Sequence, residues 1–238
     1  MKKNILIILA IFVVSVVGGI FGDQILWPYL VAGPLMRQYG IEQNPVYVTE
    51  TKEVTIQEST ALTGAIEKVD KAIIGVTSET SEKSLKGSGL ILTSDGLAVT
   101  LARLVPQGAD SMFFIEGKPV PFQILKRDLD QDLALIKLEA NNLPTVGFAD
   151  YERLKLGERV FLVGTAYGVQ EYSKTANEGA VTYFDSIFLQ TNIYEGQYLN
   201  GSPLFNIKGE ALGLTLVDPW GSRVSAIPIG TIKSFAGF

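Results

Sequence analysis

The residues with the clearest chemical potential lie in the segment EGQYLNGSPLFN, Glu195–Asn206, which is predicted to turn sharply between two strands. Gly201 and Pro203 shape this turn, and Ser202 places a hydroxyl group within it. A hydroxyl nucleophile needs a base to accept its proton, and the usual base near pH 7 is histidine. The 238 residues include no histidine, which leaves a Ser–Lys pair with Lys208, the nearest lysine in the sequence. Because Lys208 falls in a predicted exposed hairpin turn, the sequence does not favour this pair.

The composition excludes several other kinds of site. The chain has no cysteine, so it has no disulfides and no thiolate metal ligands. Its acidic residues are scattered rather than grouped at metal-ligand spacing, and Gly87 and Gly89 lack the Lys-Ser/Thr of a phosphate-binding loop. The formal net charge is −5, and no cluster of Lys and Arg is present. We therefore expect no metal, no cofactor and no nucleic-acid partner.

The amino terminus has the pattern of a membrane segment. Lys2 and Lys3 precede an uncharged run of 18 residues, Ile5–Gly22. Such a run nearly spans a bilayer core, so residues 1–23 are predicted to be a single transmembrane anchor. The positive-inside rule places the amino terminus in the cytoplasm and the residues after Asp23 outside it, in a bacterial cell envelope. The alternative interpretation is a cleaved signal peptide, which would also export the rest of the chain.

Residues 24–58 are predicted to form an extracytoplasmic tether, because Pro and Gly interrupt any helical pattern in its first half. Within it, VYVTETKEVTIQ, Val46–Gln57, alternates enough to predict one or two extended strands. Ser59 or Thr60 is a suitable N-cap for a short helix from about Thr60 to Lys71, in which apolar residues recur at helical spacing.

From residue 59 to 238 the pattern becomes that of an all-β domain. Ser94-Asp95-Gly96 and Glu116-Gly117-Lys118 are predicted hairpin turns, and IPIGTIKSFAGF is predicted to end in a short helix. Many short strands separated by turns favour a closed or sandwiched β structure. The predicted strand segments are AIIGVTS, the two strands of GSGLILTSDGLAVTLA, the hairpin SMFFIEGKPVPFQILKR, DLALIKL, RVFLVGT, EGAVTYF, IFLQTN, SPLFN, EALGLTLVD and VSAIP.

Five stretches of the chain follow one another in the order of a known family: GSGLILTSDGLAVTLARLVPQGA, DLDQDLALIKLE, LGERVFLVGTAYG, LQTNIYEGQYLNGSPLFNIKGEALGLTLV and SAIPI. Together they resemble the catalytic domain of HtrA-type (DegP/DegS-like) serine proteases. The resemblance covers about 175 residues and implies an all-β trypsin-like fold of two six-stranded antiparallel β-barrels, here preceded by the transmembrane helix and the short helix. It also implies that the family's carboxy-terminal PDZ module has no counterpart before the chain ends at Phe238.

The resemblance assigns family roles to individual positions, and most of them carry the wrong residue. The histidine position holds Arg103, the aspartate position holds Asp132 and the serine position holds Asn200. Tyr198 stands where a glycine helps to shape the oxyanion turn, and Ser202 replaces the second glycine after the serine position. The resemblance therefore implies a degenerate triad.

These replacements remove the chemistry for physical reasons. The guanidinium of Arg103 stays protonated, so it cannot act as the base, and a carboxamide at Asn200 is not an activated nucleophile. The side chain of Tyr198 limits the backbone freedom that lets N–H groups converge on an oxyanion. We expect Arg103 and Asp132 to form an ion pair that holds the two barrels together.

The resulting hypothesis is an inactive serine-protease homologue that binds extended polypeptide or a partner protein such as an active homologue. The resemblance places the peptide-binding edge at Leu216, Val217 and Asp218, and the wall of the specificity pocket at Val224 and Ser225. Two alternatives remain: an active serine endopeptidase with a nonstandard site, and a structural envelope domain whose groove is filled by its own side chains. An open groove would favour the first hypothesis over the structural one.

Overall fold

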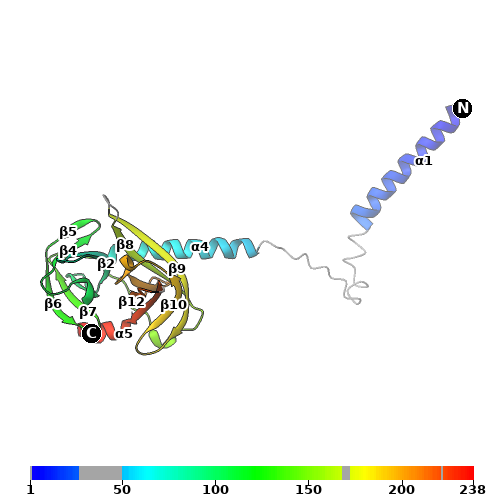
Figure 1. Cartoon of the computed structure of the whole chain (residues 1–238). Coiled ribbons are helices and arrows are strands. Elements are labelled where there is room, and N and C mark those ends of the chain that lie inside the picture. The colour runs from blue at the N-terminus through cyan, green and yellow to red at the C-terminus, as the bar shows by residue number, and fades with distance from the viewer. Residues whose placement is uncertain (1, 27–49, 168–171, 221) are drawn as a thin grey trace. The chain divides into compact units, whose positions relative to one another are not determined.

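The computed structural model describes residues 2–26, 50–167, 172–220 and 222–238, which divide into two compact units, Met1–Lys52 and Glu53–Phe238 (Figure 1). In the first unit, helix α1 covers Lys2–Phe21 and a π-helical turn, η1, covers Gly22–Leu26. Among the described residues, no helix has both the length and the apolar character needed to cross a membrane. The transmembrane anchor predicted for residues 1–23 is therefore not supported, although a helix does form there.

Helix α4, Glu50–Val69, corrects the prediction for the segment that precedes the sheets. The sequence predicts strands up to Gln57 and a helix only from Thr60, whereas the residues from 50 onward are helical. Val54 and Ala61 are seven residues apart, which is two helical turns, so the apolar spacing of the helix extends further back than its predicted cap. This period outweighs the β-propensity of the Val and Thr residues there. The other residues of the predicted tether, 27–49, lie outside the described residues.

The carboxy-terminal half of α4 packs onto the β domain. Ala65 and Val69 are buried in the main core, and Lys68 Nζ donates to the Lys208 carbonyl at 3.1 Å. A 3₁₀ turn, η2 (Asp70–Ala72), then leads into the first strand. The helix therefore begins the folded domain rather than ending a tether.

The first half of the β domain is a seven-stranded antiparallel sheet with the order β5-β4-β1-β2-β3-β7-β6. The hairpins predicted at Asp95-Gly96 and Glu116-Gly117 join β2 to β3 and β4 to β5. A 3₁₀ turn, η3 (Ala102–Leu104), follows β3. The strands are β1 (Ile73–Glu79), β2 (Ser84–Ile91), β3 (Leu97–Leu101), β4 (Asp110–Ile115), β5 (Lys118–Val120), β6 (Phe122–Asp128) and β7 (Leu133–Leu138).

This sheet curls but does not close. Strands β5 and β6 are separated only by Pro121, yet they form its opposite edges, so the two edges must approach each other at that corner. Pro119 and Pro121 have no backbone N–H and cannot donate to a ladder between those edges. The prediction of two six-stranded barrels is therefore wrong for the first of them, which is an open, seven-stranded half-barrel.

The second half is the predicted closed barrel of six antiparallel strands, in the order β10-β13-β12-β11-β8-β9. Helix α5 (Ile229–Ala236) ends the chain, as predicted, and two 3₁₀ turns, η4 (Tyr151–Arg153) and η5 (Gln197–Leu199), precede β8 and β11. The strands are β8 (Arg159–Tyr167), β9 (Tyr172–Phe184), β10 (Leu189–Tyr194), β11 (Pro203–Asn206), β12 (Ala211–Val217) and β13 (Arg223–Pro228).

One core joins the two sheets. Phe161 of β8 and Phe205 of β11 stack with ring centroids 5.4 Å apart, and both belong to the core cluster that contains Phe113 of the first sheet. Ile232 and Phe235 of α5 belong to the same cluster, and α5 lies against β7 of the first sheet (Figure 1). The two sheets are thus packed as one domain, which fixes the loops that line the site.

Candidate functional site

The turn predicted from the EGQYLNGSPLFN segment forms between β10 and β11 and is pressed against β2. Its 3₁₀ turn η5 ends at Asn200, whose carbonyl accepts a hydrogen bond from Ser88 N at 3.0 Å. Gly201 has φ +75°, and a Cβ there would lie 2.4 Å from the Ser88 carbonyl oxygen. The Gly201 N–H donates to the Thr215 carbonyl of β12 at 2.8 Å. Only glycine fits this position, because both the backbone angle and the close approach exclude a side chain.

The predicted ion pair between Arg103 and Asp132 is present. Arg103 Nε lies 2.5 Å from Asp132 Oδ2 without the alignment of a hydrogen bond, and Arg103 N donates to Asp132 Oδ1 at 2.9 Å. Both residues belong to the first sheet, in η3 and in the loop before β7. The prediction that the pair holds two barrels together is therefore wrong. The Arg103 side chain is 50% exposed, so this ion pair contributes at most about 1 kcal/mol to stability.

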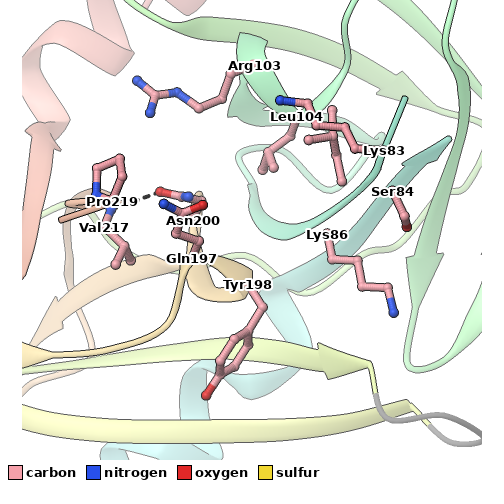
Figure 2. Close-up of a pocket in the computed structure, with 11 residues that line it drawn as sticks. Lys83, Ser84, Lys86, Arg103, Leu104, Gln197, Tyr198, Asn200, Val217 and Pro219 are labelled. Atoms are coloured by element: carbon pink, nitrogen blue, oxygen red, sulfur yellow. Dashed lines mark hydrogen bonds between the residues drawn. The ribbon is translucent and has the colours of Figure 1, made fainter. Parts of the chain in front are cut away.

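The Asn200 side chain is used within the fold. The residue is 7% exposed, and its Oδ1 accepts a hydrogen bond from Val217 N of β12 at 2.9 Å (dashed line in Figure 2). Its backbone N–H donates to the Gln197 carbonyl at 3.0 Å. In a trypsin-like site the N–H of the nucleophile residue stabilises the oxyanion, whereas here this donor points into the turn.

Ser202, the other hydroxyl of the turn, is completely buried. Its Oγ lies 3.4 Å from Ser88 Oγ, which in turn contacts Thr165 Oγ1 of β8 at 3.0 Å. Thr100 Oγ1 donates to the Ser88 carbonyl at 2.7 Å, so these hydroxyls join the turn to both sheets. Ser202 is therefore a structural hydroxyl. A pairing with Lys208, which lies in the turn after β11, is not seen.

Tyr198 lies on the rim with 43% of its surface exposed. Its hydroxyl donates to Glu195 Oε2 at 3.4 Å, and its ring covers Gly196, where a Cβ would lie 2.4 Å from Cε1. Partial burial and the neighbouring Glu195 carboxylate raise the pKa of the Tyr198 phenol. Tyr198 therefore stays neutral near pH 7 and supplies no general base there.

The predicted peptide-binding edge of β12 faces mostly toward β13. Leu216 pairs with Ser225 and Val217 with Val224, and Asp218 N donates to the first residue of β13 at 3.0 Å. Since hydrogen bonding alternates along an antiparallel ladder, the backbone groups of Leu216 and Asp218 point to β13 and only those of Val217 point outward. Ser225 Oγ also donates to the Leu216 carbonyl at 3.3 Å.

This edge therefore has no free donor for an incoming strand. The outward N–H of Val217 is bound by the Asn200 carboxamide, and the next outward residue, Pro219, has no N–H. A peptide chain placed here would meet acceptors only.

Strand β2 presents the free edge that β12 lacks. Thr80 N donates to the Lys83 carbonyl at 3.0 Å, so the backbone groups of Ser84 and Lys86, by alternation, point away from β1. Strand β3 pairs with β2 only from Gly89 onward. The N–H and C=O groups of Ser84 and Lys86 therefore have no strand partner in the described part of the chain.

The turn, η3 and the free end of β2 enclose a cleft of about 390 Å³ (Figure 2). Four of the predicted site residues line this cleft, namely Arg103, Tyr198, Asn200 and Val217. The other five do not: Asp132 pairs with Arg103 outside the lining, and Leu216, Asp218, Val224 and Ser225 belong to the β12–β13 ladder. The sequence did not predict the lining residues of β2 and of the preceding turn, Lys83–Lys86, because no local pattern marks which strand edge stays unpaired. The lining residues are Lys83, Ser84, Leu85, Lys86, Arg103, Leu104, Gln197, Tyr198, Asn200, Val217 and Pro219.

Comparisons with known proteins agree with this geometry. The family model of the trypsin-like peptidase domain matches residues 87–214. A probable periplasmic serine endoprotease DegP-like of Halomonas elongata is 31% identical over 150 residues, which cover 59% of this chain and 31% of that protein. A protein of the same description from Chlamydia pneumoniae is 28% identical over 142 residues, covering 56% of this chain and 29% of that protein. The chain thus spans about a third of the length of the curated relatives it matches.

A solved structure gives the same result for the fold. The HtrA-type protease AlgW with tripeptide superposes with a TM-score of 0.65 at 20% sequence identity. The superposition covers 74% of this chain and 62% of that one. At this identity the likeness concerns the fold alone.

Proposed function

Since the chain belongs to the family of trypsin-like peptidase domains, we propose that it is a member without peptidase activity that binds extended polypeptide outside the cytoplasm. The observation that carries the proposal is Asn200. The Asn200 carboxamide stands at the predicted serine position and accepts a hydrogen bond from Val217 N. The backbone N–H of Asn200 donates a hydrogen bond to the Gln197 carbonyl. The side chain and the backbone at the nucleophile position thus both serve the fold.

Each of the three chemical roles in peptide cleavage by this family lacks a suitable group in this chain. Proton transfer needs a group that titrates near neutral pH, and Arg103 stays charged. Nucleophilic attack needs an accessible activated hydroxyl, and Ser202 is fully buried. Oxyanion stabilisation needs converging N–H groups, and the N–H of Asn200 points into η5.

The cleft beside Asn200 supports polypeptide binding rather than a purely structural role. It remains open, with a volume of about 390 Å³, instead of being filled by Tyr198 and Arg103. The unpaired backbone groups of Ser84 and Lys86 line it, and an unpaired strand edge recognises an extended chain by adding it as a further strand. This places the bound strand on β2 rather than on β12.

The proposed location follows from the relatives, which are described as periplasmic. Their description as endoproteases favours the alternative of an active peptidase with a nonstandard site. The residues at the three triad positions weigh against that alternative in this chain.

The test of inactivity is digestion. The full chain is incubated with an unfolded protein, and new chain ends are identified by mass spectrometry, with a Ser202→Ala variant as a matched preparation. We expect no new chain ends from the wild type beyond those that the variant preparation also gives. Cleavage by the wild type that disappears in the variant would replace the proposal with an active peptidase.

The test of polypeptide binding uses a proline at the free edge. Ser84→Pro removes an N–H that faces the cleft at the first residue of β2, where proline is tolerated. Ser81→Pro, in the exposed β1–β2 turn, is the control. We expect a labelled unstructured peptide to lose most of its affinity for the first variant and to bind the control as it binds the wild type. Equal binding by both variants would contradict strand addition at β2.

A further inference from the structure

The cleft carries an unusual charge for this protein. Its lining includes the three cations Lys83, Lys86 and Arg103 and no carboxylate from the described residues. The whole chain has a net charge of −5, so this positive lining is a local feature. Glu79 ends β1 and Glu82 lies in the β1–β2 turn, but neither lines the cleft.

These cations are available to a ligand. In the described part of the chain, the ammonium groups of Lys83 and Lys86 have no ion-pair or hydrogen-bond partner, and both residues are exposed. Arg103 uses Nε toward Asp132, which lies outside the cleft lining, and half of its side chain remains exposed. Its terminal guanidinium nitrogens therefore have room for a second carboxylate.

The positions of the cations fit a chain rather than a single small anion. In Figure 2, Arg103 and Lys86 lie on different sides of Asn200, and their ends point in different directions. The unpaired backbone groups of Ser84 and Lys86 lie along the same wall. Side chains alternate between the two faces of an added strand, and Lys83 and Lys86 are three positions apart. Acidic side chains on both faces of the strand would therefore be needed to reach both lysines.

We propose that the cleft selects acidic polypeptide segments, with Lys83, Lys86 and Arg103 contacting carboxylates of a strand that is added to β2. This inference rests on the proposed function, because it specifies the chemistry of the polypeptide bound at the same site. Exposed ion pairs contribute little each, so the three together should raise affinity about tenfold at low salt.

The experiment compares three labelled peptides by fluorescence anisotropy with the full chain at low and at raised salt. The peptides share one unstructured sequence in which the same four consecutive residues are all Glu, all Gln or all Lys, so that both faces of an added strand carry them. Two variants are measured beside the wild type. K83Q/K86Q removes two charges from the cleft, and K71Q/K118Q removes two exposed charges elsewhere.

We expect the Glu peptide to bind about tenfold more tightly than the Gln peptide, and the advantage to fade with salt. K83Q/K86Q should abolish most of this advantage, and K71Q/K118Q should keep it. If the Glu and Gln peptides bind equally while Ser84→Pro still weakens both, the acidic preference is overturned and strand addition survives. If no peptide binds, both proposals fail.

Discussion

The hydrogen bond from Val217 N to Asn200 Oδ1 makes a quantitative prediction about stability. Asn200→Ala removes the acceptor and leaves the Val217 N–H without a partner, in a residue that is only 2% exposed. An orphaned buried donor costs about 1–3 kcal/mol of unfolding free energy. For a domain of this size each kcal/mol lowers Tm by about 2–4 °C, so we expect a fall of about 2–12 °C.

Asn192 offers a matched control within the same barrel. Its Oδ1 accepts a hydrogen bond from Ala180 N at 2.7 Å, but Asn192 is exposed. Water can replace the lost acceptor there, so Asn192→Ala should change stability by less than about 0.5 kcal/mol. The two variants thus remove the same group from a buried and from an exposed position.

The assay is thermal unfolding of the full chain followed by circular dichroism, with urea unfolding to obtain the free energy. The reasoning would be refuted if Asn200→Ala unfolded at the wild-type temperature, or if both variants lost equal stability. Either result would mean that the Asn200 side chain does not stabilise the turn through β12, and the case for its structural role would fall.

Two further predictions concern catalysis and pH. The double variant Arg103→His, Asn200→Ser places the family's catalytic residues at the predicted triad positions. Its peptidase rate should still be at least about 100-fold below that of an active HtrA-type protein, because the backbone N–H at position 200 donates to the Gln197 carbonyl and not to an oxyanion. A rate within tenfold of the active protein, measured with an unfolded substrate, would contradict this prediction. Hydrogen bonds from Lys137 and Thr93 lower the pKa of Asp95 from 3.8 to about 2, so this carboxylate stabilises the fold above pH 4 and the benefit is lost as pH falls toward 2. Urea midpoints of Asp95→Asn should therefore lie slightly below wild type at pH 6 and converge with it near pH 2; a constant gap would argue against the linkage.

Local pattern was sufficient for much of the fold. The hairpins at Asp95-Gly96 and Glu116-Gly117 formed where predicted, because Gly96 and Gly117 adopt positive φ at little cost. The carboxy-terminal helix α5 also formed as predicted. The order of five weak segments was enough to identify the family, which the match over residues 87–214 confirms.

Other features depended on contacts between distant residues and could not be read locally. Closure of the first sheet requires hydrogen bonds between its two edge strands, β5 and β6. Pro119 and Pro121 lie at the corner where these edges meet and have no backbone N–H to donate. The helical state of residues 50–57 depends on continuity with the part of α4 that packs on the core. The ion pair of Arg103 with Asp132 was predicted correctly, but the sequence did not show that both residues belong to the same sheet.

By itself, the sequence determined the all-β class and the family, because those properties follow from residue types and their order. It also predicts the loss of the triad's proton-handling and nucleophilic residues. Only the tertiary structure decided which backbone donors remain free. The register of β12 and β2 directs Val217 toward Asn200 and leaves Ser84 and Lys86 open to the cleft. Hydrogen-bond direction alternates along a strand, so a shift of one residue in register, which leaves the composition unchanged, would reverse both outcomes.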